Sequence, residues 1–148
     1  MGFISSASGA SMWRGYEYYK YKKVSSCSAT SRNEFEGIVL GGKRYQVKID
    51  VEHPRKSSCN CAFADGRRVI CKHMVALYFT AFPQEAAAYY KQVLEWEKED
   101  EERQEQTKRD VIEFVSNMSK EDLQRELLTI LFDGPDWLYE RFIKEHLE

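Results

Sequence analysis

Apolar and polar residues alternate in the first part of the chain. Every second residue of Tyr45–Val51 is apolar, which is the period of a half-buried strand. Two further strands are expected at Lys23–Ala29 and Glu34–Leu40. Polar turn residues at Thr30–Asn33 and a Gly-Gly pair at 41–42 separate the three segments. The pattern therefore predicts a small antiparallel sheet of three strands.

Longer apolar periods predict helices in the rest of the chain. Ile70–Phe82 is dense enough in apolar residues to form a buried helix, and Pro83 ends it. Ser119 with Asp122 has the pattern of a helix start, and a Gly-Pro pair at 134–135 divides the last helical stretch in two. Between these points, helical spacing continues through Gln84–Trp96, Glu95–Asp110 and Val111–Met118.

A cluster of metal-ligand residues lies between the last predicted strand and the buried helix. Cys59-Asn60-Cys61 is followed, after nine residues, by Cys71-Lys72-His73. Zn²⁺ prefers four thiolate or imidazole ligands in a tetrahedron, and the two pairs supply such a set. Buried or disulfide-linked cysteines are the alternative, but this pattern without a secretory context is more typical of a metal site. The expected ligands are Cys59, Cys61, Cys71 and His73.

Two other residues could take part in such a site. Cys27 lies outside the spacing of the cluster and is expected to be a structural or free thiol. His53 is a competing candidate ligand, although an exposed loop imidazole fits it better because four ligands are already present.

The spacing Cys59-x-Cys61-x9-Cys71-x-His73 resembles the SWIM zinc finger, whose pattern is C-x-C, a variable loop and C-x-H. The flanking segments also resemble that family, and the likeness is clearest over Phe35–Phe82. Asn60 and Ala62 depart from it, because many members read C-S-C-P there. The resemblance implies a zinc-binding interaction module without catalytic activity.

The resemblance also bears on two segments outside the cysteine cluster. Met12–Tyr21 is rich in Trp and Tyr and its spacing fits a helix or a strand, and the resemblance implies a helix packed on the sheet. The aromatic residues there could stack on bases or supply buried area. The segment that begins at Ser119 resembles the helical pair that follows the finger in bacterial stand-alone members.

The sequence thus predicts an α+β fold in three parts. Residues 1–11, mostly small and polar, are expected to be a flexible leader. Residues 12–82 are expected to form a SWIM-like zinc-binding domain with a small antiparallel three-stranded sheet plus a helix. Residues 83–148 are expected to be an acidic, all-helical C-terminal extension.

Charge divides the chain in the same way. The formal net charge is −2, but residues 1–82 hold 13 Lys and Arg against 6 Asp and Glu, whereas residues 83–148 hold 9 against 18. Arg55, Lys56, Arg67 and Arg68 flank the two ligand pairs. They could contact nucleic-acid phosphates or be ordinary solvated loop charges.

Several classes of function find no support in the sequence. No apolar run approaches the length of a membrane span, and reduced thiols that hold zinc fit a cytoplasmic protein. The chain has no Gly-rich phosphate loop, no H-E-x-x-H and no nucleophile elbow, so it is not expected to be an enzyme. The predicted function is a zinc-binding module for protein–protein and/or nucleic-acid interaction. The alternative is DNA binding through the basic face around the zinc loop, with RNA also possible.

Overall fold

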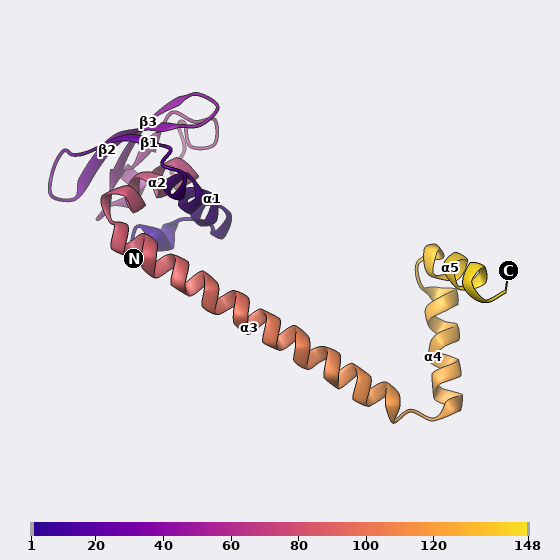
Figure 1. Cartoon of the computed structure of the whole chain (residues 1–148). Coiled ribbons are helices and arrows are strands. Elements are labelled where there is room, and N and C mark those ends of the chain that lie inside the picture. The colour runs from indigo at the N-terminus through magenta and orange to yellow at the C-terminus, as the bar shows by residue number, and fades with distance from the viewer. Residues whose placement is uncertain (1, 148) are drawn as a thin grey trace. The chain divides into compact units, whose positions relative to one another are not determined.

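The computed structural model describes residues 2–147 and divides into two compact units, Met1–Leu94 and Glu95–Glu148. The first unit combines a sheet with helices, and the second is helical (Figure 1). No helix among residues 2–147 is long and apolar enough to cross a membrane.

The first unit has a mixed order of helices and strands. Its elements are η1 (Ile4–Ser6), α1 (Gly9–Lys20), β1 (Val24–Ala29), β2 (Glu34–Leu40), β3 (Arg44–Asp50), η2 (Pro54–Lys56), β4 (Ser58–Cys59), α2 (Lys72–Ala81) and the first turns of α3 (Pro83–Ser116).

The sheet has four antiparallel strands in the order β1-β2-β3-β4, so the expectation of three strands was wrong by one. The additional strand, β4, pairs Cys59 with Val47 and Ser58 with Lys48 of β3. Because β4 is only two residues long, it is too short to show an alternating pattern in the sequence. The other three strands lie within one residue of the predicted segments.

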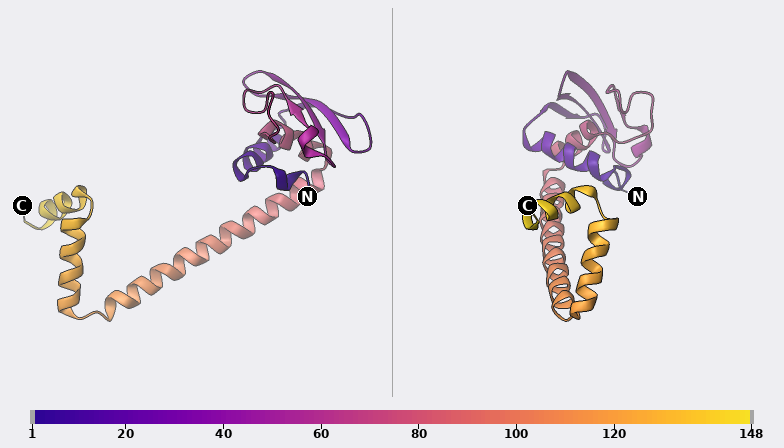
Figure 2. Two further views of the ribbon diagram at one scale, coloured as in Figure 1. Left: turned by 180° about the vertical axis from the view of Figure 1, so that it is seen from behind. Right: turned by 90° about the vertical axis from the view of Figure 1, so that its right-hand side faces the viewer.

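Helix α2 is the centre of the first unit. It contacts every strand of the sheet on one side and α1 on the other, and both helices lie on the same side of the sheet (Figures 1 and 2). Met74, Leu77 and Phe79 of α2 are completely buried. The approach of α1 is close at Gly15, where an added Cβ would overlap the Val75 side chain. The buried helix predicted at Ile70–Phe82 is therefore present as the shorter α2, Lys72–Ala81, which ends before Pro83.

The described part of the N-terminal segment, from residue 2, is part of this packing, whereas a flexible leader was expected at residues 1–11, of which residue 1 lies outside the described residues. Phe3 is 2% exposed, and its ring stacks on Tyr78 at a centroid distance of 5.0 Å. Ala7 forms a parallel bridge with Ile70. A few apolar residues among small polar ones give no periodic signal, so the sequence did not reveal this contact.

The compact unit also extends past residue 82, where the sequence analysis placed a boundary. Ala86 is fully buried, and the Tyr89 ring stacks on Phe79 at 5.5 Å. Tyr90 stacks on Tyr16 of α1 at 5.3 Å. The aromatic-rich segment at 12–21 thus lies mostly in the helix α1, as the resemblance implied. Tyr16 packs this helix against Phe79 of α2 and Tyr90 of α3.

The second unit contains the rest of α3, α4 (Lys120–Asp133) and α5 (Asp136–His146). Ser119 begins α4 as predicted, because its Oγ accepts a hydrogen bond from the Asp122 amide at 3.1 Å. Leu131 is the one buried side chain among residues 95–147. Most apolar side chains of this unit are therefore exposed to solvent.

Candidate metal centre

The first two cysteines of the cluster, Cys59 and Cys61, lie at the edge of the sheet. Cys59 ends β4, directly opposite Val47 of β3. Asn60 continues this pairing, because its Oδ1 accepts a hydrogen bond from the Gln46 amide at 3.0 Å. The backbone turns immediately afterwards, since the Cys61 carbonyl accepts hydrogen bonds from Ala64 and Asp65. Cys59 and Cys61 are both buried as a result.

A short loop connects this turn to α2. Gly66 adopts a φ of +67°, a left-handed conformation that favours glycine. Arg67 donates a hydrogen bond from Nη1 to the Phe63 carbonyl at 3.2 Å, which holds the loop together. Cys71 then becomes the N-cap residue of α2, and His73 lies in the first helical turn. The two halves of the motif therefore approach each other from β4 and from the start of α2.

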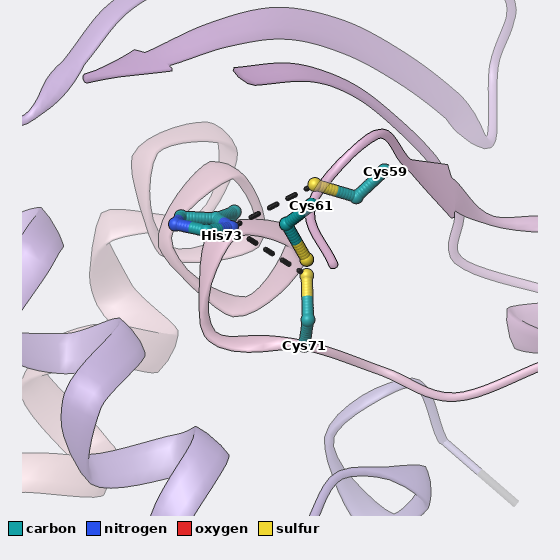
Figure 3. A group of neighbouring side chains, drawn as sticks. All are labelled: Cys59, Cys61, Cys71 and His73. Atoms are coloured by element: carbon teal, nitrogen blue, oxygen red, sulfur yellow. Dashed lines mark hydrogen bonds between the residues drawn. The ribbon is translucent and has the colours of Figure 1, made fainter. Parts of the chain in front are cut away.

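The four side chains converge on one point. The metal-ligand atoms of Cys59, Cys61, Cys71 and His73 all lie within 4.8 Å of one another, and all four residues are buried. His73 Nδ1 is 3.7 Å from Cys59 Sγ and 3.9 Å from Cys71 Sγ (Figure 3). Tetrahedral zinc–thiolate and zinc–imidazole bonds would separate such atoms by about 3.6 Å. The cluster therefore has the size and donor set that fit a metal ion.

The protons of the cluster are unevenly shared. The pKa of Cys71 is lowered to about 4, first because the Cys59 thiol donates a hydrogen bond to it, and further because of His73 and the Met74 amide. The pKa of Cys59 is raised by the same hydrogen bond and by burial. Cys71 is thus poised as a thiolate at the N-terminus of a helix, where backbone amides favour negative charge.

The two additional candidates from the sequence lie outside this cluster. Cys27 is in β1 opposite Gly37, and burial raises its pKa. His53 Nδ1 lies 3.5 Å from Asp50 Oδ2, and its side chain is 55% exposed. None of the four cysteines is in a disulfide.

The predicted basic residues separate into two groups. Arg67 and Arg68 line a groove of about 720 Å³, together with Lys48. Arg55 and Lys56 lie in η2 and do not line it. The groove runs along polar strand positions that pair in register, Ser28 with Glu36, Glu36 with Lys48, and Lys48 with Ser58. Sequence reasoning missed Lys48, although the same alternation that predicted β3 places it on this face.

Comparison with known proteins agrees with this geometry. Residues 45–82 match the family model of the SWIM zinc finger, a stretch that contains all four cluster residues. No curated protein and no solved structure matches the chain. The chain therefore contains a SWIM zinc finger at residues 45–82, which confirms the resemblance in the sequence.

The site has the chemistry of a closed metal centre. Four protein ligands complete a tetrahedron and leave no position for a substrate or an activated water. A metal ion here would join the end of β4, the Cys61 turn and the start of α2. Its direct effect would be to hold these segments together.

Proposed function

We propose that this chain is a zinc-dependent interaction module in which the metal is structural, and that it is not an enzyme. The convergence of three buried cysteines and the His73 Nδ1 atom on one point carries the proposal. Zinc is the best candidate because thiolate and imidazole ligands in a tetrahedral arrangement favour it over Mg²⁺, Ca²⁺ or Mn²⁺. The closed ligand set supports a binding role. Four free cysteines support a reducing compartment such as the cytoplasm.

Metal analysis of the full chain tests this proposal. We expect one zinc ion per wild-type chain, none or a small fraction in Cys71→Ser, and full occupancy in Cys27→Ser. The second variant is a matched control, because Cys27 is a free cysteine of the same unit outside the cluster. A wild-type protein without zinc, or a Cys71→Ser protein that keeps it, would contradict the proposal.

We propose that the second, helical unit binds a protein partner whose surface is apolar and bordered by basic residues. Support comes from large apolar side chains in this unit, since Phe114, Phe132 and Trp137 are 70%, 67% and 58% exposed. Exposed apolar surface of this kind is typical of interaction sites. The excess of acidic residues after residue 82 complements basic residues around such a patch.

The test begins with the chain alone and continues with a purified partner. Sedimentation of the wild-type protein should show a monomer. A partner captured from a lysate should, once purified, bind the wild-type chain and lose at least tenfold in affinity for Phe114→Ser. A Gln104→Ser variant, changed at an exposed polar position of the same helix, should bind normally. A stable dimer that Phe114→Ser dissociates would show instead that a second copy covers this surface.

Nucleic-acid binding is a second candidate, and the position of Arg67 and Arg68 in the groove supports it. The groove has no aromatic side chain among its lining residues, so stacked bases are not its expected ligands. Phosphate contacts by arginine and lysine fit it better. DNA binding through this face is thus the specific form of the proposal, with RNA as the related possibility.

Binding of duplex DNA, single-stranded DNA and RNA across a salt series tests this candidate. We expect affinity to fall steeply with salt, because phosphate contacts release counterions. Arg67→Glu/Arg68→Glu should abolish binding. Arg55→Glu/Lys56→Glu changes the same charge outside the groove and should weaken binding much less. Equal losses of affinity in the two double variants, or no binding of the wild-type chain at low salt, would rule out a groove-specific site.

A further inference from the structure

The ligand His73 lacks the hydrogen bond that usually fixes a metal-bound histidine. Its Nδ1 atom faces the thiols of Cys59 and Cys71. Its other ring nitrogen, Nε2, is buried and has no hydrogen-bond partner among residues 2–147. A metal-bound histidine normally donates this second N–H to a carboxylate, a carbonyl or water, which sets the orientation of the ring. Here the orientation must be set in another way.

Two tyrosine rings enclose the imidazole. Tyr45 of β3 stacks on His73 at a centroid distance of 4.0 Å and an interplanar angle of 20°. Tyr18 of α1 lies edge-on to the same ring, at 5.3 Å and 69°. One ring covers a face of the imidazole and the other packs against it at a steep angle, so rotation of the His73 ring would displace one of them.

We infer that Tyr18 and Tyr45 are positioning residues that hold His73 Nδ1 toward the cysteine thiols and so slow the loss of the metal. This inference rests on the proposed zinc site. The two rings replace the missing hydrogen-bond acceptor by packing against an imidazole whose Nε2 atom is buried. Neither residue is a ligand.

The turn between β2 and β3 packs against both rings. A Cβ added at Gly41 would lie 2.9 Å from Tyr45 Cε2 and 3.1 Å from Tyr18 Oη. A Cβ added at Gly42 would meet nothing within 4 Å. Lys72 Nζ lies 4.8 Å from the centre of the Tyr18 ring and so attaches this ring to α2. The Gly41 turn therefore limits movement of both tyrosine rings in its direction.

This arrangement makes metal retention depend on residues outside the zinc-finger match. Tyr18 and Gly41 both precede residue 45, where the match begins. The segment before the finger is then part of the metal centre, because it supplies one of the enclosing rings and the turn that supports them.

The rate of zinc release to an excess of a chromogenic chelator tests the inference in the full chain. We expect Tyr18→Leu and Tyr45→Leu to release zinc about 10–100-fold faster than wild type, by analogy with the loss of metal affinity when a hydrogen-bonding partner of a ligand is removed. Tyr18→Phe and Tyr45→Phe should release it at nearly the wild-type rate, because the ring makes the contact. Gly41→Ala should accelerate release, whereas Gly42→Ala should not.

Two controls separate positioning from a general loss of stability. Tyr89→Leu removes a ring that packs on Tyr16 and Phe79 in the same unit without touching His73, so it should lower the melting temperature more than it changes zinc release. Absorption bands of the Co²⁺-substituted protein report directly on ligand geometry and should change in Tyr45→Leu but not in Tyr89→Leu.

The outcomes distinguish this inference from the proposed function. A wild-type chain without zinc would contradict the zinc site itself. A wild-type chain with one zinc, combined with tyrosine-to-leucine variants that release it no faster than Tyr89→Leu, would overturn the positioning role. Phenylalanine variants that release zinc as fast as the leucine variants would overturn its basis in ring packing.

Discussion

At the residue scale, Cys59 and Cys71 differ in how they hold protons. Cys71 has a pKa lowered to about 4, whereas the pKa of Cys59 is raised, because the Cys59 thiol donates its proton toward Cys71. The pair therefore retains a proton, held toward Cys59, that a metal must displace. Zinc binds the thiolate form, so the Cys59 proton must leave when the metal enters.

We therefore expect zinc affinity to rise with pH across the neutral range. Protons compete with zinc for Cys59, so affinity falls as the pH is lowered. Calorimetric titrations at one pH in two buffers of different ionisation enthalpy should differ in heat, and the difference gives the number of protons released. We expect at least one. Identical heats in both buffers, with affinity independent of pH, would contradict the proton distribution inferred for the cluster.

The ligands were predictable because metal coordination requires particular residue types at short, recognisable spacings in the sequence. All four predicted cluster residues come together in the structure. No sequence motif predicts the roles of Tyr18, Tyr45 and Phe3, because these roles arise from contacts between distant segments. Tyr18 in α1 and Tyr45 in β3 both contact His73 because α1 and α2 pack together on one side of the sheet.

At the scale of elements, the contact between α1 and α2 depends on the absence of a side chain at Gly15. A Cβ there would overlap Val75 and approach the Lys72 carbonyl oxygen to 2.9 Å. Met12 of α1 and most of α2 are buried in the core, so the two helices cannot separate without opening it. The helix pair also carries Tyr18 and His73, which links this packing to the metal centre.

We expect Gly15→Ala to lower the free energy of unfolding by about 1–3 kcal/mol, the usual cost of overpacking a tight contact. Alanine's better helix propensity offsets only part of this cost. Gly9→Ala is a matched control in the same helix, because a Cβ there meets nothing within 4 Å. Urea unfolding of the zinc-loaded proteins, followed by near-UV circular dichroism, measures both effects. A Gly15→Ala midpoint at or above that of wild type would contradict the packing.

Strands and helices differed in how well the sequence predicted them. Alternation located β3, and the turn residues at Thr30–Asn33 and at 41–42 delimited β1 and β2. The two residues of β4 are defined by their partners in β3, which a local pattern cannot contain. The expected succession of helical segments from residue 84 to residue 118 is the single helix α3, whose charged middle carries i,i+4 pairs such as Lys98–Glu102.

At the scale of the whole molecule, the two compact units differ in what stabilises them. The first has a continuous core that reaches from Phe3 to Ala86 and surrounds the metal-ligand cluster. The second has one buried side chain among its described residues, Leu131, and is held by local contacts between α4 and α5. Zinc removal should therefore act on the first unit alone.

Hydrogen exchange measured with and without a chelator tests this division. A structural zinc ion contributes about 10–16 kcal/mol in small fingers, comparable to the 5–15 kcal/mol that stabilises a whole domain. We expect amides of β3, β4 and α2 to lose most of their protection when zinc is removed, and amides of α4 and α5 to keep theirs. Protection that is unchanged in α2 would mean that the core holds the fold without the metal. Equal losses in both units would mean that the helical unit depends on the finger for its stability.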